Sequence, residues 1–223
     1  MALLNNKLIA HFTTKVVRPS LGPDYFLFRK RDLARVSGPF VQLLAMSVSR
    51  SGALRVHPCF YVAGADLSLE VIPQNVSLEV QDPHRWTYLQ PTLDAAFAQR
   101  LLQQLEADSP QSFVAPLSGD ASVSRVFQSF AARTVDWSSN LYHAFYLLTR
   151  GRPEATQELA QARARFNKLG ERRVGQAPSW RFVLAERLDE LERRLTLPEG
   201  CELCRAEAQQ QAQRLELPEI YWS

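Results

Sequence analysis

Two cysteines near the end of the chain have the spacing that most directly suggests chemistry. Cys201 and Cys204 form a C-x-x-C pair within the segment 197–215. Such a pair can supply half of a zinc site or a redox-active dithiol. A structural zinc site needs four ligands, but the chain has one further cysteine, Cys59, and four scattered histidines. On a helix both cysteines would continue a stripe of small residues. We therefore favour two buried thiols in a helix–helix contact over the metal and redox alternatives, and expect no metal and no cofactor.

A second candidate group lies in the segment 54–62, which alternates like a strand. Arg55, His57, Cys59 and Tyr61 would share one face of it. A Cys–His dyad needs the two side chains in contact, whereas residues two apart on a strand stand roughly 7 Å from each other. We interpret this face as a half-buried surface, with polar and aromatic recognition of a partner as the functional alternative. Pro58 within the run suggests an edge strand or a bulge.

A third group, Asp136, Asn140 and His143, would lie on one side of a helix. A solvated face is the simpler interpretation, and the wall of a polar pocket is the alternative. The chain contains none of the motifs G-x-S-x-G, H-E-x-x-H, G-x-G-x-x-G or G-x-x-x-x-G-K-[ST]. Since no catalytic constellation is visible, we do not expect an enzyme.

The densest basic stretch is "FRKRDLAR", which contains Arg29, Lys30, Arg31 and Arg35. It belongs to a basic front: residues 1–60 carry a net charge of +7, whereas the rest of the chain carries −4. A basic surface favours an acidic partner, either a protein or a nucleic acid. Interleaved aromatics, including Tyr25 and Phe28, could stack on bases. Protection of an edge strand by charge is the alternative. We expect the partner-binding residues to be Arg29, Lys30, Arg31, Arg35, Arg55, His57 and Tyr61.

The elements that would carry these residues change in character along the chain. Residues 2–17 have the stripe Leu4, Leu8, Phe12 and Val16 and predict a helix that Pro19 ends. The segment 38–64 predicts a β-hairpin, because two apolar runs flank "SRSG". Two further short strands are expected at 67–73 and 75–80.

From Pro91 the hydrophobic period becomes helical. Thr92 is a candidate N-cap for the first of these helices. The expected helices are 91–108, 122–133, 136–151, 152–170, 178–195 and 199–215. The prediction is an α+β fold: an N-terminal helix, an antiparallel sheet of four to five strands and an array of five to six helices. We divide the chain into a sheet-containing subdomain, 1–90, and a helical subdomain, 91–223, packed as one unit.

The front of the chain resembles a family of uncharacterised bacterial α+β proteins of the immunity type, often encoded beside toxins. In these proteins an N-terminal helix leads to a Gly–aromatic–Lys/Arg segment and then a hydrophobic hairpin. Here Phe28–Arg31, Val41–Gln42, Ser49–Gly52 and Phe60–Val62 stand in those places. The resemblance covers about residues 4–65 and implies a protein-binding role without catalysis. It transfers no catalytic residue.

The composition of the chain indicates its cellular compartment. No run of about 18 apolar residues occurs, so we expect no transmembrane helix, and the N-terminus lacks the apolar core of a signal peptide. Three cysteines are too few for a disulfide framework, which favours a reducing cytoplasm.

The expected function is a bacterial protein-binding factor that docks an acidic or enzymatic partner, such as a toxin. A nucleic-acid-binding component of a defence or regulatory system is the alternative. The oligomeric state does not follow from the sequence.

Overall fold

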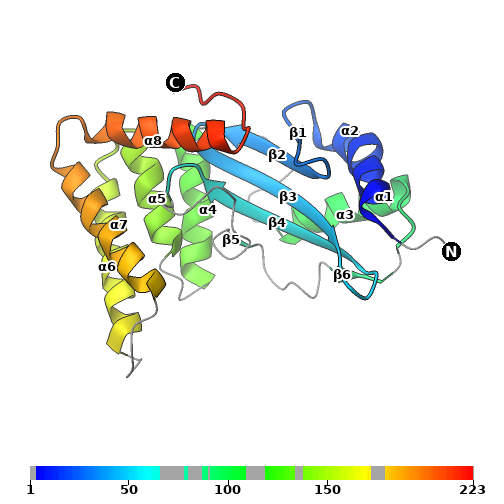
Figure 1. Cartoon of the computed structure of the whole chain (residues 1–223), viewed down its shortest axis with the longest axis horizontal. Helices are drawn as coiled ribbons and strands as arrows, with labels where there is room; N and C mark the ends of the chain where they lie inside the picture. The colour runs from blue at the N-terminus through cyan, green and yellow to red at the C-terminus, as the bar shows by residue number, and fades with distance from the viewer. Residues whose placement is uncertain are drawn as a thin grey trace. The chain divides into compact units, whose positions relative to one another are not determined.

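The computed structural model describes residues 4–65, 78–79, 87–89, 91–108, 119–133, 138–171 and 179–222. It has the expected α+β architecture, with helices before and after an antiparallel sheet (Figure 1). The described chain separates into two compact units. Unit 1 comprises residues 1–37, 41–61 and 77–119, and unit 2 comprises 38–40, 62–76 and 120–223. The expected strand at 67–73 lies outside the described residues, as do the first and last parts of 75–80.

The N-terminal helix begins and ends four residues later than predicted, at 6–21 and not at 2–17, and its helix type changes along its length. It consists of α1 (Asn6–Phe12), the π-helical turn η1 (Thr13–Val17) and α2 (Arg18–Leu21). The side chain of Asn5 caps α1 by accepting from the backbone N–H groups of Lys7 and Leu8, both at 3.0 Å.

The prediction that Pro19 ends this helix is wrong. Proline has no N–H and its ring collides with the carbonyl four residues earlier in an α-helix. In η1 the N–H of Arg18 instead donates to the carbonyl of Thr13, five residues back, and this wider turn admits Pro19. The extra residue in η1 moves the buried position from Val16 to Val17, and Leu8 of the predicted stripe is exposed. The buried face is formed by Ile9, Phe12, Thr13, Val17 and Leu21.

The sheet runs in the order β1-β2-β3-β4-β5, with β6 also pairing with β4. Its strands are β1 (Phe26–Phe28), β2 (Asp32–Ser37), β3 (Phe40–Val48), β4 (Leu54–Val62), β5 (Leu78–Glu79) and β6 (Thr87–Tyr88). The pairs β1–β2, β4–β5 and β4–β6 are antiparallel. The predicted hairpin is confirmed: β3 and β4 are joined through a turn in which Gly52 has a φ of +80°.

Pro58 does not mark an edge strand, because β4 has partners on both sides. On one side β4 pairs with β6 at Leu54 and Arg55 and with β5 at Cys59 and Phe60. Pro58 lies between these two short ladders, where its missing N–H breaks no described pairing.

One face of the sheet in unit 1 is covered by the N-terminal helix and α3 (Ala95–Asp108) (Figure 1). The Thr13 hydroxyl lies 3.4 Å from the sulfur of Met46 on β3, and the rings of Phe12 and Phe97 are 5.7 Å apart. The N-cap of α3 is Asp94 and not Thr92, since the Asp94 carboxylate accepts from the N–H of Phe97 at 2.8 Å. These contacts bury the hydrophobic core of unit 1.

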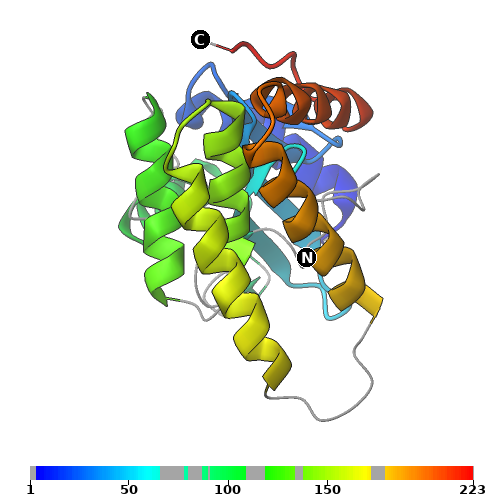
Figure 2. The ribbon, with the colours of Figure 1, turned by 90° about the vertical axis from the view of Figure 1, so that its left-hand side faces the viewer.

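Unit 2 contains the remaining helices, and Figure 2 shows α5, α6 and α7 beside one another. The helices are α4 (Gly119–Arg133), α5 (Ser138–Thr149), α6 (Ala155–Glu171), α7 (Ser179–Leu195) and α8 (Gly200–Arg214). None of the helices in the described part of the chain combines the length and apolarity needed to cross a bilayer.

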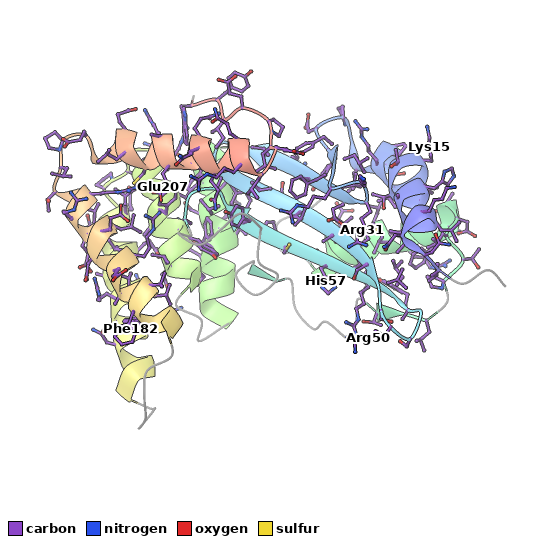
Figure 3. The ribbon with its side chains drawn as sticks, viewed as in Figure 1. Lys15, Arg31, Arg50, His57, Phe182 and Glu207 are labelled. Atoms are coloured by element: carbon purple, nitrogen blue, oxygen red, sulfur yellow. The ribbon has the colours of Figure 1, made fainter. Side chains whose placement is uncertain are left out.

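A buried arginine organises the packing of unit 2 around Gly64. Arg187 on α7 is 1% exposed and donates to the carbonyl oxygens of Gly64 and Ala65. Its guanidinium also pairs with Glu190 at 2.9 Å and with Glu207 of α8 at 3.0 Å. Figure 3 labels Glu207 on α8. Because a buried charge is costly without partners, these four contacts are what allow Arg187 to be enclosed.

Candidate functional site

The three consecutive basic residues Arg29, Lys30 and Arg31 form the loop between β1 and β2. Phe28 pairs with Asp32, so the loop contains only these residues. Arg29 and Lys30 have φ values of +49° and +66°. These values lie in the left-handed region, which residues other than glycine rarely adopt. Both side chains are exposed, and the Arg29 guanidinium lies 4.9 Å from the centre of the Phe28 ring. The turn therefore presents adjacent cations at the end of a hairpin.

Two arginines attach this hairpin to the N-terminal helix within unit 1. The Arg31 guanidinium donates to the side-chain oxygen of Asn6 at 2.6 Å, and Arg18 donates to the carbonyl of Tyr25 at 3.0 Å. Lys7 and Lys15 on the same helix are exposed, and Figure 3 labels Lys15 and Arg31. We call the residues Arg29, Lys30 and Arg31 the basic loop.

The basic loop has little acidic compensation. Asp32 follows it, and its carboxylate lies 4.0 Å from Arg31. Burial raises the pKa of Asp32, although the N–H of Met46 and the nearby arginines act in the opposite direction. The backbone N–H of Met46 on β3 donates a hydrogen bond to the Asp32 carboxylate at 3.0 Å. This bond directs the carboxylate toward β3.

Arg35 and Tyr61, which the sequence placed on the partner surface, lie in the interior. Arg35 is 5% exposed, donates to Gln42 at 2.6 Å and lies 4.8 Å from the centre of the Tyr25 ring. Burial lowers the pKa of its guanidinium, while Tyr25 and Asp24 act in the opposite direction. Tyr61 has no exposed surface. A folded chain offers neither side chain to a partner.

The face that carries Arg55 and His57 is open only near the β3–β4 turn. Arg55 is exposed and His57 half-buried, whereas Cys59 and Tyr61 farther along β4 are buried. Figure 3 labels His57 on β4 and Arg50 at the β3–β4 turn. Alternation along the strand assigned the residues to the two faces of the sheet. It could not predict at which residue along a face other elements begin to bury the side chains.

The two C-terminal cysteines differ in their surroundings. Cys204 is buried, and burial raises the pKa of its thiol although Arg194 lies 3.5 Å away. Cys201 is only half-buried, and its sulfur lies 3.5 Å from the carbonyl of Thr149 on α5. The packing role is therefore confirmed for Cys204 between α7 and α8, while the expectation of burial is wrong for Cys201. Within the described ranges no group of three or more His, Cys, Asp and Glu residues could hold a metal ion.

The expectation of a solvated face at Asn140 and His143 is also wrong. Asn140 is 2% and His143 4% exposed, and Asp136 lies outside the described residues. Asn140 donates to Glu158 of α6 at 2.6 Å, and the His143 ring is stacked on Phe127 at 5.0 Å. The pocket-wall alternative is the one that the structure bears out. The lining residues of this pocket, which lies on α4, α5 and α6, include Ser124, His143 and Glu158.

Ser124 and Glu158 were not singled out from the sequence. Ser124 precedes His143 by 19 residues and Glu158 follows it by 15, so no local motif joins them. The Ser124 oxygen lies 2.9 Å from Nε2 of His143, and Glu158 Oε1 lies 3.3 Å from Nδ1. Burial alone would raise the pKa of Glu158, but the hydrogen bonds from His143 and Asn140 outweigh it and the pKa lies below its usual value.

Comparison with known proteins gives no relative. No protein-family model, no curated sequence and no solved structure matches this chain. The candidate functional sites are the basic loop of unit 1 and the polar pocket of unit 2.

Proposed function

We propose that this chain is a protein-binding factor of the immunity type that docks an acidic or enzymatic partner, such as a toxin, through its basic loop. The observation that carries the proposal is the pair of exposed cations, Arg29 and Lys30, held at positive φ on a hairpin. Left-handed backbone at residues other than glycine costs of order 1–3 kcal/mol, and such strained positions cluster at functional sites. Charge complementarity at such a surface accelerates association and selects the partner.

The surroundings of the loop favour a protein over a nucleic acid. Binding to single-stranded nucleic acid relies on aromatic rings that stack on bases. Tyr25 has no exposed surface and Phe28 is 4% exposed, so neither ring offers an open face for stacking. Leu27, between them on β1, is 38% exposed and places an apolar contact beside the cations. A mixed basic and apolar surface fits an acidic protein with a hydrophobic anchor.

The test compares charge reversal in the basic loop with reversal elsewhere. From cells that encode both this chain and its partner, the wild-type chain should capture the partner. The variant Arg29→Glu/Lys30→Glu should no longer capture it. The matched variant Lys168→Glu/Arg214→Glu makes the same charge change at exposed positions of unit 2 and should keep it. Association rates with the purified partner should fall only for the loop variant, because steering depends on local charge. Equal rates for both variants would contradict the proposal.

Nucleic-acid binding is measured in parallel with short labelled DNA and RNA over a salt series. We expect only weak, sequence-independent binding at about 150 mM salt. A protein that neutralises five phosphates would show a slope of about −4 in log affinity against log salt. Submicromolar binding with that slope, lost in the loop variant, would make the nucleic-acid function the better proposal.

A further inference from the structure

The polar pocket of unit 2 contains a serine, a histidine and a glutamate in the relation that activates a nucleophile. Ser124 Oγ lies 2.9 Å from His143 Nε2, and Glu158 Oε1 lies 3.3 Å from His143 Nδ1. A histidine with its proton on Nδ1 donates to the carboxylate and accepts from the serine hydroxyl. This is the order nucleophile, base and orienting acid that defines a serine triad by geometry, whatever the fold or sequence order.

The histidine is held rigidly. Its ring is enclosed, 4% exposed, and is stacked on Phe127 with an interplanar angle of 19°. Glu158 is fixed in turn by Asn140, which donates to Oε2 at 2.6 Å and also to Gln161 at 3.2 Å. A base that is oriented by a carboxylate, itself oriented by a further donor, is prepared for proton transfer.

The pocket can admit a ligand to the serine. Its volume is about 500 Å³, and Ser124, His143 and Glu158 all contribute to its lining. Asn140 is 2% exposed and lies beside the same histidine in an adjoining pocket, and its Oδ1 accepts no hydrogen bond from any described residue. A buried acceptor of this kind normally has a partner, so this one is available to a donor on a ligand.

The charge of the lining narrows the ligand class. Asp120 accepts from Tyr146 at 2.9 Å and pairs with Arg150 at 3.0 Å and Arg152 at 2.7 Å, so the two arginines exceed its charge by one. Glu154 and Glu158 add negative charge to the same pocket. With the two arginines included, these groups carry a net charge of −1, which favours an uncharged or cationic substrate over an anionic one.

We propose that Ser124, His143 and Glu158 form an esterase site for small uncharged or cationic carboxylic esters. Ser124 Oγ bonds to the carbonyl carbon while its proton passes to His143 Nε2. Collapse of the intermediate breaks the ester C–O bond, and the alcohol leaves with that proton. A water molecule then attacks the acyl-serine in the same way, releasing the carboxylic acid and restoring the hydroxyl.

Ser124 lies inside α4, so helix bonding occupies the neighbouring backbone N–H groups. The oxyanion therefore needs side-chain donors, and Arg152 and Gln128 line the same pocket. Glu158 acts on the reaction through His143 and is a positioning residue. This activity is independent of the basic loop.

The test uses a fluorophosphonate probe and two esters, p-nitrophenyl acetate and acetylcholine. We expect the probe to modify Ser124 in the folded full chain, identified by peptide mass, and not in chain unfolded in urea. Ester turnover should fall about 10²–10⁴-fold in His143→Gln. Ser124→Ala should abolish both labelling and turnover. Glu158→Gln should lower kcat with KM unchanged, which a loss of packing alone would not produce.

The control Ser20→Ala/His11→Gln replaces an exposed serine and an exposed histidine of unit 1 and should label and hydrolyse like the wild type. Thermal unfolding confirms that each variant is folded. Absence of labelling of Ser124 in the folded wild-type chain overturns the proposal, whatever the variants do. Labelling that survives unfolding, or turnover unchanged in Ser124→Ala, overturns it equally.

Discussion

At the scale of single residues, Gly64 shows how closely the backbone of unit 2 approaches itself. Its φ is +87°, and a Cβ built on it would lie 2.7 Å from Phe145 Cζ and 2.8 Å from the backbone nitrogen of Ala208. The N–H of Gly64 donates to Gln211, and its carbonyl accepts from Arg187. A side chain at this position would therefore disturb both the helix α8 backbone and the bonds around a buried charge.

We expect Gly64→Ala to destabilise the protein by about 2–4 kcal/mol, through left-handed strain and overpacking together. The matched variant is Gly52→Ala. Gly52 has a similar φ of +80° but nothing within 4 Å of its built Cβ, so it should cost only about 1–2 kcal/mol. Urea unfolding of both variants measures the difference. Equal losses would mean that the close approach to Ala208 contributes nothing.

At the scale of elements, the β1–β2 turn keeps a backbone that its residues do not favour. Lys30 has a φ of +66°, where glycine carries no steric penalty. Lys30→Gly should stabilise the chain by about 0.5–1 kcal/mol, because the relieved strain exceeds the entropy that glycine adds. The same change at Arg50, an exposed turn residue without positive φ, should not stabilise it.

Denaturant midpoints of Lys30→Gly and Arg50→Gly decide this point, and partner binding is measured on the same samples. A gain in stability together with a loss of binding in Lys30→Gly is the pattern of strain retained for function. If Lys30→Gly is less stable than the wild type, the positive φ is not a strained feature of the turn.

At the scale of the whole molecule, the two units should respond to acid in opposite directions. In unit 2, burial alone would raise the pKa values of Asp120 and Glu190. Hydrogen bonds and charge interactions with arginines, and for Asp120 a hydrogen bond from Tyr146, outweigh burial and lower both pKa values. Glu158 behaves likewise. Carboxyl groups with a lowered pKa stabilise the fold above their unfolded pKa, about 4, and lose this contribution as the pH falls. In unit 1, Asp32 has a raised pKa, so protonating it favours the folded state.

We therefore expect acid unfolding to begin in unit 2. Hydrogen exchange at pH 7, 5, 4 and 3 should show protection falling first in α4–α7, while the strands around Asp32 keep theirs. The control Asp120→Asn removes one titrating group and should reduce the loss of stability between pH 5 and 3. Protection that falls first in β2 and β3 would contradict the assignment.

The sequence by itself determined the kinds of element and their order, because those depend on local periodicity and on turn residues. Alternation and Gly52 predicted the β3–β4 hairpin, and a period near 3.6 predicted the helices after Pro91. It also located the concentration of charge before residue 60. It did not predict the π-helical turn Thr13–Val17 before Pro19, since that turn depends on how the helix packs against β3.

Only the tertiary structure decided which side chains are accessible and which meet. Arg35 and Tyr61 are of residue types that are common on recognition surfaces, but in the folded chain both side chains are buried. Ser124, His143 and Glu158 lie on three different helices and come together only when α4, α5 and α6 pack. Periodicity describes the faces of one element at a time, whereas burial and side-chain contacts depend on the neighbour that each face receives.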